Sequence, residues 1–380
     1  MHLDHTSSNG GAEYALLRML QAPAPWNYRV LLPKMGVNEI DVFAGLPAGT
    51  VRRRGPHQPA GATKAVGPVP AATLGVRLAG QAVVLRTSRL VRSADVVHAN
   101  STRAALYGAM ALTGSRIPYV VHLRDLISPE SLGRVGFRLF TEVALRRADG
   151  VIANSAATLA SASPYLREEA ASTVLPSAAG IGAIRPSRST PAAVRTVGMV
   201  ARIDHWKGQD LLIRAFARSA LREEARLVLA GGTPFGMEPY LEQLRALTQR
   251  LGVADAVEFR GHVDDVPGFI DEMDVCVQCS TRPEPLGQNV LQYLSRGAVV
   301  IASNEGGPTE WVVHRQNGVL FAPRDEGALA AALTEVGADR ALRARLAENA
   351  SRTPGLRSDD DAARDHAAFF TLVHDRKRGL

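Results

Sequence analysis

Short apolar runs recur along the chain between stretches that have the spacing of amphipathic helices. The runs lie at residues 28–32, 96–98, 119–122 and 151–153, and again at 196–200, 226–230, 256–259, 274–277 and 299–302. Apolar runs that alternate with helical stretches are typical of parallel strands covered by helices on both faces. The pattern therefore predicts an α/β chain built on doubly wound parallel sheets.

The alternation pauses between residues 176 and 193, where Ser, Pro, Ala and Gly dominate. This pause predicts a linker, and 380 residues exceed one ordinary core, so we expect two domains facing a cleft. The predicted domains are Rossmann-like units over 1–183 and 184–357. Residues 358–380 begin acidic and end basic, which suits a helix dipole, and we expect this helix to pack back on the first domain.

The first strand of the pattern is short, because only residues 1–4 precede a glycine-rich loop. A central strand is normally longer. Two readings remain open on the sequence: the strand is unusually short, or the natural start of the protein lies earlier.

Composition narrows the class of protein. Hydrophobic residues make up 46% and charged residues 21% of the chain, and no run approaches the roughly 18 apolar residues of a spanning helix. The first residues lack the basic-then-apolar order of a secretory signal, so a cytoplasmic protein is expected.

The only two cysteines, Cys276 and Cys279, exclude a disulfide framework and a four-cysteine zinc site. They are three apart on a predicted strand, so their side chains face opposite ways and we interpret them as buried structural residues.

The net charge of +7 suggests an anionic partner, such as nucleic acid, a membrane surface or a phosphorylated small molecule. Arginine greatly outnumbers lysine, which indicates a compositional bias of the genome. Aromatic residues are only 5% of the chain and do not interleave with basic residues, so no nucleic-acid partner is expected.

Residues 42–94 contain basic but no acidic residues, and Arg86, Arg89 and Arg92 recur there at a spacing of three. One reading is a basic amphipathic helix, within residues 74–92, that lies on an anionic membrane. The other is a surface helix packed on its own domain.

A basic pair follows the apolar run at 196–200. Arg202 and Lys207 lie in the loop between this predicted strand and the next helical stretch. Two cations at a strand end can bind a diphosphate, because arginine offers a planar fork and lysine a compact charge. The alternative is that both are ordinary surface cations.

Glu284 lies between Pro283 and Pro285, which hold it in a stiff turn before a helix predicted to begin near Leu286. This turn projects the Glu284 carboxylate into the predicted cleft. Backbone amides at a helix amino end favour a phosphate, and the amides expected to do so belong to Leu286, Gly287 and Gln288.

A second glycine-rich loop, with Gly306 and Gly307, follows the run at 299–302 and offers further amides to a ligand. Glu310 is assigned a structural role at the start of the next helix.

Three segments, in this order and spacing, resemble the GT-B glycosyltransferases of the retaining family 4 type. The segments read HTSSNGGAE, VARIDHWKG, and EPLGQNVLQ with SNEGGPTE. The resemblance implies a transferase that moves a sugar from a nucleoside-diphosphate donor of the UDP or GDP type to a hydroxyl acceptor, with retention of anomeric configuration. It also implies that the first domain binds the acceptor and the second the donor, with no metal ion or other cofactor.

The resemblance assigns roles position by position. Arg202 and Lys207 would bind the donor diphosphate and stabilise its charge as it leaves, in place of a metal. Glu284 would contact the sugar and support the charge at its anomeric carbon. His122 matches the histidine of the sugar site.

Further donor contacts are implied at Gly10 and Gly11 from the first domain, and at Leu286, Gly287, Gln288, Gly306 and Gly307. The turn of Gly261, His262 and Val263 would read the base through its backbone.

One position departs from the family pattern. Gln292 stands where the family has a second glutamate that accepts hydrogen bonds from ribose hydroxyls. The amide keeps an acceptor but loses the charge, so ribose binding is expected to be weaker by about 1 kcal/mol without loss of catalysis.

Mechanism and partners stay open at this point. Glu284 as a nucleophile and front-face attack assisted by the departing phosphate both fit, and the family pattern favours the second. An inverting enzyme would need a base such as Asp125, His98 or His5. A catalytically silent donor-binding or scaffold subunit is the other alternative, with Gln292 as its only support.

The acceptor is not readable from the sequence. A lipid carrier, a glycan and a secondary metabolite are all compatible with it, and a peripheral position on the inner membrane face is compatible with the basic segment.

Overall fold

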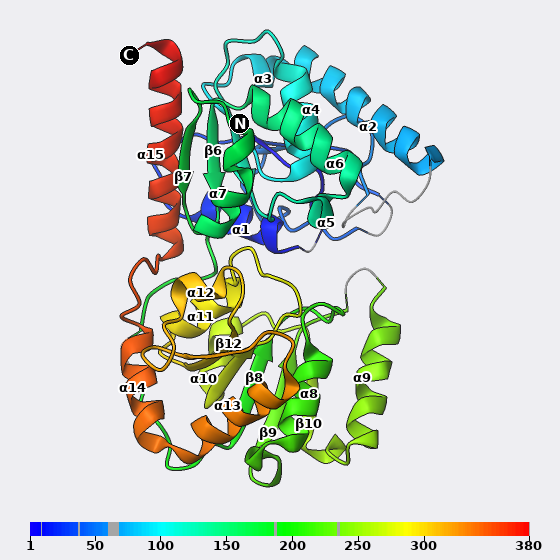
Figure 1. Ribbon diagram of the computed structural model, residues 1–380. Helices are drawn as coiled ribbons and strands as arrows, with labels where there is room; N and C mark the ends of the chain where they lie inside the picture. The colour runs from blue at the N-terminus through cyan, green and yellow to red at the C-terminus, as the bar shows by residue number, and fades with distance from the viewer. Residues whose placement is uncertain (9, 37–38, 60–67, 186–187, 234–235, 380) are drawn as a thin grey trace. The chain divides into compact units, whose positions relative to one another are not determined.

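The computed structural model describes the whole chain except residues 9, 37–38, 60–67, 186–187, 234–235 and 380 (Figure 1). Its described residues form two compact units. Unit 1 comprises Met1–Gly180 and Asp359–Leu380, and unit 2 comprises Ile181–Ser358. The division after Gly180 falls three residues before the boundary expected from the sequence, and the C-terminal segment belongs to unit 1.

Unit 1 is built on a parallel sheet with the strand order β3-β2-β1-β4-β5-β6-β7. Its strands are β1 (His2–Leu3), β2 (Val30–Leu32), β3 (Val51–Arg53), β4 (Val97–Ala99), β5 (Tyr119–Leu123), β6 (Gly150–Ala153) and β7 (Ala171–Val174). The five inner strands are buried along their whole length, which matches their apolar sequences. The first strand is indeed only two residues long.

Unit 2 repeats this design with the order β10-β9-β8-β11-β12-β13, again with every pairing parallel. Its strands are β8 (Thr196–Val200), β9 (Arg226–Ala230), β10 (Val257–Gly261), β11 (Val275–Gln278), β12 (Val299–Ser303) and β13 (Val319–Phe321). The prediction of doubly wound parallel sheets is therefore confirmed.

Both sheets reverse their strand order at one place, between β1 and β4 in unit 1 and between β8 and β11 in unit 2. Helices that follow strands on opposite sides of such a reversal cover opposite faces of the sheet, which leaves a crevice at the carboxyl ends. The loops after β8 and β11 contain Arg202, Lys207 and Glu284, so the fold itself brings the predicted donor residues to this point.

The helices of unit 1 cover both faces of its sheet. Side chains of α2 (Pro68–Thr87), α4 (Thr102–Leu112) and the π-helix η1 (Phe140–Leu145) share a core with Leu3, Val97 and Val121 on one face. On the other face, α1 (Gly11–Gln21) and α15 (Asp359–Arg378) pack against strands β2, β5 and β6. The remaining helices are α3 (Arg89–Arg92), α5 (Pro129–Leu132), α6 (Arg134–Leu139), α7 (Ala156–Ala162) and η2 (Ser163–Tyr165).

Helix α15 begins with Asp359, Asp360 and Asp361 and ends with Arg376, Lys377 and Arg378, as its charge pattern predicted. Both groups complement the helix dipole. Phe369, Phe370 and Val373 bury its apolar side against the sheet of unit 1, where the helix runs alongside β6 and β7 (Figure 1).

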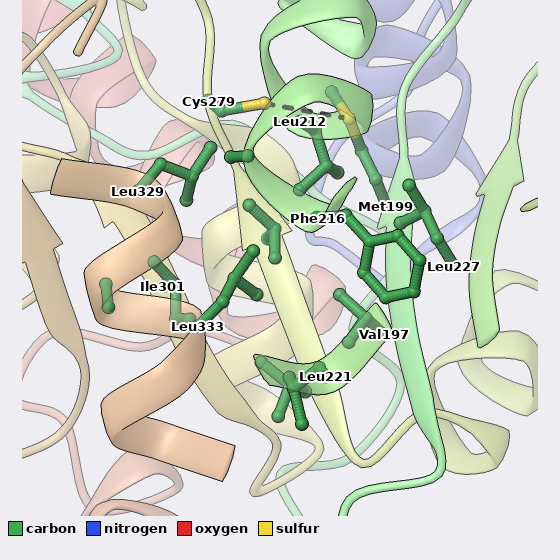
Figure 2. Close-up of a cluster of buried hydrophobic side chains, with 14 of the residues drawn as sticks. Val197, Met199, Leu212, Phe216, Leu221, Leu227, Cys279, Ile301, Leu329 and Leu333 are labelled. Carbon is green, nitrogen blue, oxygen red and sulfur yellow. Dashed lines mark hydrogen bonds between the residues drawn. The ribbon is translucent and has the colours of Figure 1, made fainter. Parts of the chain in front are cut away.

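The main core of unit 2 lies under helices α8 (Gln209–Arg218), α9 (Glu238–Arg250), α13 (Glu326–Ala338) and α14 (Arg340–Ala350). Figure 2 shows Phe216 and Leu212 of α8 and Leu333 of α13 directed toward Val197 and Ile301 of the sheet. The other helices of this unit are η3 (Ala220–Glu223), η4 (Ala254–Ala256), α10 (Val266–Glu272), α11 (Gln288–Ser295) and α12 (Pro308–Trp311).

Both cysteines are buried, which confirms their structural interpretation. The Cys279 thiol lies 4.0 Å from the Met199 sulfur in the core that Figure 2 shows. Burial raises the pKa of the Cys276 thiol to about 12 and that of the Cys279 thiol further, so neither forms a thiolate readily.

The basic segment of unit 1 is two helices rather than one. Helix α2 ends at Thr87 and α3 begins at Arg89, with Ser88 in extended conformation between them. Arg86 donates hydrogen bonds to the carbonyls of Ala111 and Thr113 in its own unit. None of the helices in the described part of the chain has both the length and the apolar character needed to cross a membrane.

Candidate active site

The loop after β8 carries the predicted basic pair. Arg202 is tied to Asp204, whose carboxylate lies 3.1 Å from its guanidinium, and 36% of the Arg202 side chain is exposed. Lys207 lies at the other end of the loop, with its ammonium 3.9 Å from the centre of the Trp206 ring. Arg202 and Lys207 therefore both lie against the Trp206 ring, and the Arg202 side chain, although paired with Asp204, stays partly exposed.

Lys207 and Glu284 form an ion pair, with 2.6 Å between Nζ and Oε1. Ser280 Oγ donates a second hydrogen bond of 2.6 Å to the same carboxylate oxygen. Glu284 has only 8% of its side chain exposed and Lys207 17%. The pair is thus largely removed from solvent, where an ion pair with good geometry interacts more strongly than at a surface.

Glycine is required where the two loops meet. Gly208 has φ +79°, and a Cβ there would lie 2.1 Å from the carbonyl oxygen of Cys279. Gly306 has φ +69°, and a Cβ there would lie 2.5 Å from the carbonyl oxygen of Glu284. Both positions combine a left-handed backbone with no room for a side chain, which holds the Lys207 and Glu284 loops at fixed positions.

The loop of Gly306 and Gly307 supports Glu284 directly. The Gly307 amide donates a hydrogen bond of 2.7 Å to the carbonyl of Glu284, and Glu284 forms a parallel bridge with Gly306. Leu286 is buried, and Glu310 lies in the first turn of α12, the structural role expected for it. The two predicted glycine-rich segments therefore form one structure around Glu284.

Helix α11 begins at Gln288, two residues later than expected, with Gly287 in left-handed conformation as its cap. Predicting the start at Leu286 was wrong because the chain needs a left-handed residue to turn from the Glu284 loop into the helix. Asn289 donates to the carbonyl of Val200, which anchors the helix at the end of β8. Gln292 is 9% exposed, on the same helix.

The turn at 261–263 lies at the end of β10. Gly261 has φ +74° and its carbonyl accepts a hydrogen bond from the Gly231 amide. His262 is exposed and lies 3.3 Å from Asp264. Gly261 and Val263 on either side of it are half-buried.

In unit 1, Gly10 caps α1 and Gly11 is its first residue; Asn9 of the same segment lies outside the described residues. The Glu13 carboxylate packs against Gly10, where a Cβ would lie 2.2 Å from Oε2. Burial, and then the neighbouring charge of Asp4, raise the pKa of Glu13 to about 8. At neutral pH this carboxyl therefore carries its proton.

A polar network lies beside Glu13, at the carboxyl ends of the central strands. Asn100 donates a 2.5 Å hydrogen bond to the Asp4 carboxylate and accepts one of 2.5 Å from Arg124. Asp4, His5 and Glu13 bring ligand atoms within 4.8 Å of one another. We assign no ion to this group, because Asn100 and the His5 amide already bond Asp4 and Arg124 supplies positive charge.

His122 does not lie where the resemblance places it. Its ring is 2% exposed, 3.3 Å from His98 through Nδ1 and stacked on His366 of α15. In β5, Tyr119, Val121 and Leu123 point to one face, so His122 points to the other, toward α15. His98 is 1% exposed, which also removes it as a candidate base.

Several residues of the site were not identified from the sequence. Ser280 and Trp206 contact the ion pair; Trp206 belongs to the segment VARIDHWKG, and Ser280 lies four residues before Glu284. Glu13 is the last residue of the glycine-rich segment HTSSNGGAE. Nothing in the local sequence indicates that its carboxyl is buried beside Asp4. Asn100 and Arg124 follow strands β4 and β5, the position where ligand-binding residues of such sheets gather.

Two family models match the chain in succession. The model "Glycosyltransferase Family 4" matches residues 31–177 and the model "Glycosyl transferases group 1" matches residues 182–353. The junction between them lies next to the boundary after Gly180 that separates the units.

Curated relatives match parts of the chain. A GDP-mannose-dependent alpha-(1-6)-phosphatidylinositol monomannoside mannosyltransferase of Mycobacterium tuberculosis is 38% identical over 154 residues, which cover 38% of this chain and 39% of the relative. The lipopolysaccharide core biosynthesis glycosyltransferase LpsE of Rhizobium meliloti is 33% identical, over 44% of this chain and 47% of the relative. These matches span less than half of either relative.

Solved structures match over nearly the full length. HepE of Anabaena in complex with UDP and glucose is 27% identical, with a TM-score of 0.75 over 98% of both chains. Sucrose-phosphate synthase of Thermosynechococcus elongatus has a TM-score of 0.78 over 98% of both chains at 20% identity, which speaks for the fold alone.

Two Rossmann-like parallel sheets, each with one reversal of strand order and each matched by its own family model, lead to one assignment. The chain belongs to the GT-B glycosyltransferases of the group 1 and family 4 type.

Proposed function

We propose that this protein transfers a sugar from a nucleoside-diphosphate sugar to a hydroxyl acceptor, with retention and without a metal ion. The observation that carries the proposal is the Lys207–Glu284 pair at the strand reversal of unit 2, with Arg202 on the same loop. In the related HepE structure UDP and glucose are bound. Cations, a carboxylate and tight glycine turns at this point are what a diphosphate joined to a sugar requires.

The donor diphosphate is proposed to bind Arg202 and Lys207. Arg202 is paired with Asp204 and has about a third of its side chain exposed, and we assign the exposed part of its guanidinium to the phosphate oxygens. Lys207 is already held by Glu284 and by the Trp206 ring. Two fixed cations stabilise the charge that develops on the leaving diphosphate, the task of a metal ion in other transferases.

Glu284 is proposed to face the transferred sugar. Its carboxylate is fixed by Lys207 and Ser280, and its backbone by Gly307. A negative charge held in this way favours the positive charge that grows at the anomeric carbon. The amides around Gly287, Gln288, Gly306 and Gly307 are assigned to the same ligand.

The proposed step is front-face attack. The acceptor hydroxyl oxygen bonds to the anomeric carbon while the bond from that carbon to the phosphate oxygen breaks. The proton of the hydroxyl passes to the departing phosphate oxygen, so that the products are the glycoside and the nucleoside diphosphate. Configuration is retained because attack and departure share one face. Direct attack by Glu284 is the alternative route to the same outcome.

The proposal leaves His122 out of the catalytic residues. A ring that is 2% exposed and enclosed by His98 and His366 cannot contact a sugar without a rearrangement of the core. Gly10 and Gly11 keep their assignment to the donor, and the base is assigned to the backbone of Gly261, His262 and Val263.

The donor base is either uracil or guanine. The name of the mycobacterial relative specifies GDP-mannose, and the titles of the HepE structures specify UDP and UDP-glucose. Both are consistent with recognition by backbone groups.

The acceptor is proposed to lie at an anionic membrane surface on the cytoplasmic side. Val76 and Val83 of α2 are 73% and 62% exposed, and Arg89 and Arg92 of α3 are exposed nearby in the sequence. Exposed apolar and basic side chains together suit a peripheral membrane contact. Liposomes of anionic lipid should bind the protein, and replacement of Arg86, Arg89 and Arg92 by Glu should abolish this; unchanged binding would remove the proposal.

The donor site is tested by thermal shift with UDP, GDP, TDP, CDP and their sugar conjugates, with and without Mg²⁺. A ligand at about a hundred times its dissociation constant stabilises the folded state by about 2.7 kcal/mol. We expect one nucleotide to raise the melting temperature without Mg²⁺, and we expect this increase to be lost in Lys207→Ala. A shift that requires Mg²⁺ would contradict the metal-independent mechanism.

Gln292 supports one other function, a silent donor-binding subunit. That reading expects nucleotide binding with neither transfer nor hydrolysis across a wide acceptor panel. Turnover with any acceptor would exclude it.

A further inference from the structure

Four histidine rings lie next to one another in the interior of unit 1. His2, His98 and His122 come from the adjacent strands β1, β4 and β5, and His366 comes from α15. All are between 1% and 4% exposed. They form one continuous cluster across the contact between the sheet and α15, and the proposed transfer reaction uses none of them.

The rings contact one another in sequence. His2 Nδ1 lies 2.9 Å from His98 Nδ1, and His98 Nε2 lies 3.3 Å from His122 Nδ1. The His122 ring then stacks on His366, with 5.3 Å between their centres. A hydrogen bond between two imidazoles needs one donor and one acceptor, so each of these bonds requires an unprotonated ring nitrogen.

His366 joins the helix to the cluster in a defined tautomer. Its Nδ1 lies 2.6 Å from the carbonyl of Ala362, so Nδ1 carries the proton and donates it. Among the described residues, Nε2 of His366 and Nε2 of His122 have no hydrogen-bond partner. A proton added at either nitrogen would be a buried charge without an acceptor, which is strongly unfavourable.

The surroundings of the cluster are apolar or positive. Trp26 and Phe370 lie against the His2 ring, with centres 5.8 and 5.9 Å away. The charged groups that act on the rings are the Met1 amine, which precedes β1 and lies near Asp95, and Arg124, which follows β5. Asp4 and Glu13 act on Arg124, and in the described part of the chain no carboxylate hydrogen-bonds any of the four rings.

We infer that this histidine cluster is an acid-sensitive contact, which stabilises the packing of α15 on unit 1 only while the four histidine rings are neutral. Other contacts of the helix do not involve histidine: Ala362 and Ala363 pack on α1, and Phe369, Phe370 and Val373 pack on the sheet. The Asp359 and Asp149 carboxylates bond the Gly180 amide and Lys377, and these contacts last until the carboxylates take up protons. The cluster is therefore the part of the contact that responds to mild acid.

The direction of the effect follows from linkage. Burial lowers the pKa of all four histidines, to about 4 for His366, whereas exposed histidine titrates near 6.5. When α15 detaches from unit 1, the exposed histidines bind protons that they do not bind while α15 is packed. The packing of α15 is therefore weakened as the pH falls from about 6.5 to about 4. Each histidine that opening exposes should raise the opening constant of α15 by about tenfold between pH 7.5 and 5.5.

The test is hydrogen exchange of the full chain between pH 7.5 and 5.5, read by mass spectrometry on peptides of α15 and of α8 and corrected for intrinsic exchange rates. The inference expects opening of α15 to increase at least about tenfold while α8 of unit 2 stays protected. Equal increases in both helices would mean global unfolding and would overturn it, as would exchange of α15 independent of pH.

Two variants separate the cluster from acid effects in general. His366→Leu should lower the pH-dependent increase in α15 opening by about tenfold. His122→Leu should lower it by a similar factor and replaces His366→Leu if that variant folds poorly. His374→Gln removes a histidine of the same helix that pairs with Asp375 outside the cluster, and it should exchange like the natural protein. A change in His374→Gln as large as that in His366→Leu would assign the effect to the helix and not to the cluster.

Discussion

Lys207 Nζ lies 2.6 Å from Glu284 Oε1, although the two residues are 77 positions apart in the chain. They meet because β8 and β11 are adjacent strands whose following loops lie at the same edge of the sheet. The pair thus holds a cation and an anion at a fixed separation, and under the proposed function the cation would bind the diphosphate and the anion would face the sugar. Fixed charges of this kind need no reorganisation when the reaction occurs.

Lys207→Ala should lower kcat by about 10² to 10³, the loss typical of removing one group that stabilises a developing charge. Lys207→Arg should recover part of this, because the guanidinium keeps the charge but cannot copy a compact ammonium. Steady-state kinetics with the donor found by thermal shift would measure both. Equal activity of Lys207→Ala and the natural protein would refute the role.

Glu284→Gln should reduce kcat much more than it changes KM. The amide keeps the hydrogen bond from Ser280 and the shape of the side chain, so donor binding survives, but the charge that supports the anomeric centre is lost. Glu326→Gln is the matched control, since Glu326 pairs with Arg218 on the surface of the same unit. A change in KM alone would show that Glu284 only binds the donor.

Gly306→Ala should destabilise unit 2 by more than about 2 kcal/mol and lower activity with it. The new Cβ would lie 2.5 Å from the Glu284 carbonyl oxygen and would also force a side chain into left-handed conformation. Gly252→Ala shares the positive φ but meets no atom within 4 Å, so it should cost only about 1 kcal/mol. Chemical unfolding of both variants would separate the steric contribution from the conformational one.

Glu13→Gln should change the pH dependence of stability in unit 1. The folded-state pKa of about 8 is above that of an exposed carboxyl, so the natural protein loses stability as pH rises from about 4.5 to 8. The variant cannot ionise at this position, so across this pH window its free energy of unfolding should rise relative to that of the natural protein by an amount on the order of a few kcal/mol. Urea unfolding at pH 5 and pH 8.5 measures it, with exposed Glu169→Gln as the control.

Gln292→Glu should tighten binding of the nucleotide about fivefold, equivalent to about 1 kcal/mol, by restoring a charged acceptor for ribose. The gain should vanish for a nucleotide without ribose hydroxyls. Calorimetry with the two nucleotides decides this; the same gain for both would mean that position 292 acts through the overall charge of the site.

Strands β8 to β12 of unit 2 were predicted nearly residue by residue, because four of them are inner parallel strands with continuous apolar runs. The strands that the sequence missed are β3, β7 and β13, which lie at sheet edges. Arg52 and Arg53 in β3 and Ser172 and Thr173 in β7 interrupt the apolar pattern, since an edge strand is partly exposed. Their pairing depends on the neighbouring strand and not on their own sequence.

The meeting of Lys207, Glu284 and the loop of Gly306 and Gly307 in unit 2 was predictable, because these residues fall in short segments with recognisable spacing. The histidine cluster was not, because residues 2, 98, 122 and 366 share no local pattern. His122 shows the difference: its position at a strand end agreed with the resemblance, but the face of the strand on which a side chain lies depends on register. Only the three-dimensional packing of α15 reveals that this face is covered.

Helix α15 belongs to unit 1 but follows all of unit 2 in the chain. During synthesis, the side chains that α15 covers therefore stay uncovered until α15 has left the ribosome; they are Val120, Ile152 and the histidine rings of β1, β4 and β5. Unit 2, which is continuous in sequence, can complete its own core earlier. The sheet of unit 1 is therefore fully covered only after α15 has been made, so removal of α15 should expose the interior surface formed by Val120 and Ile152.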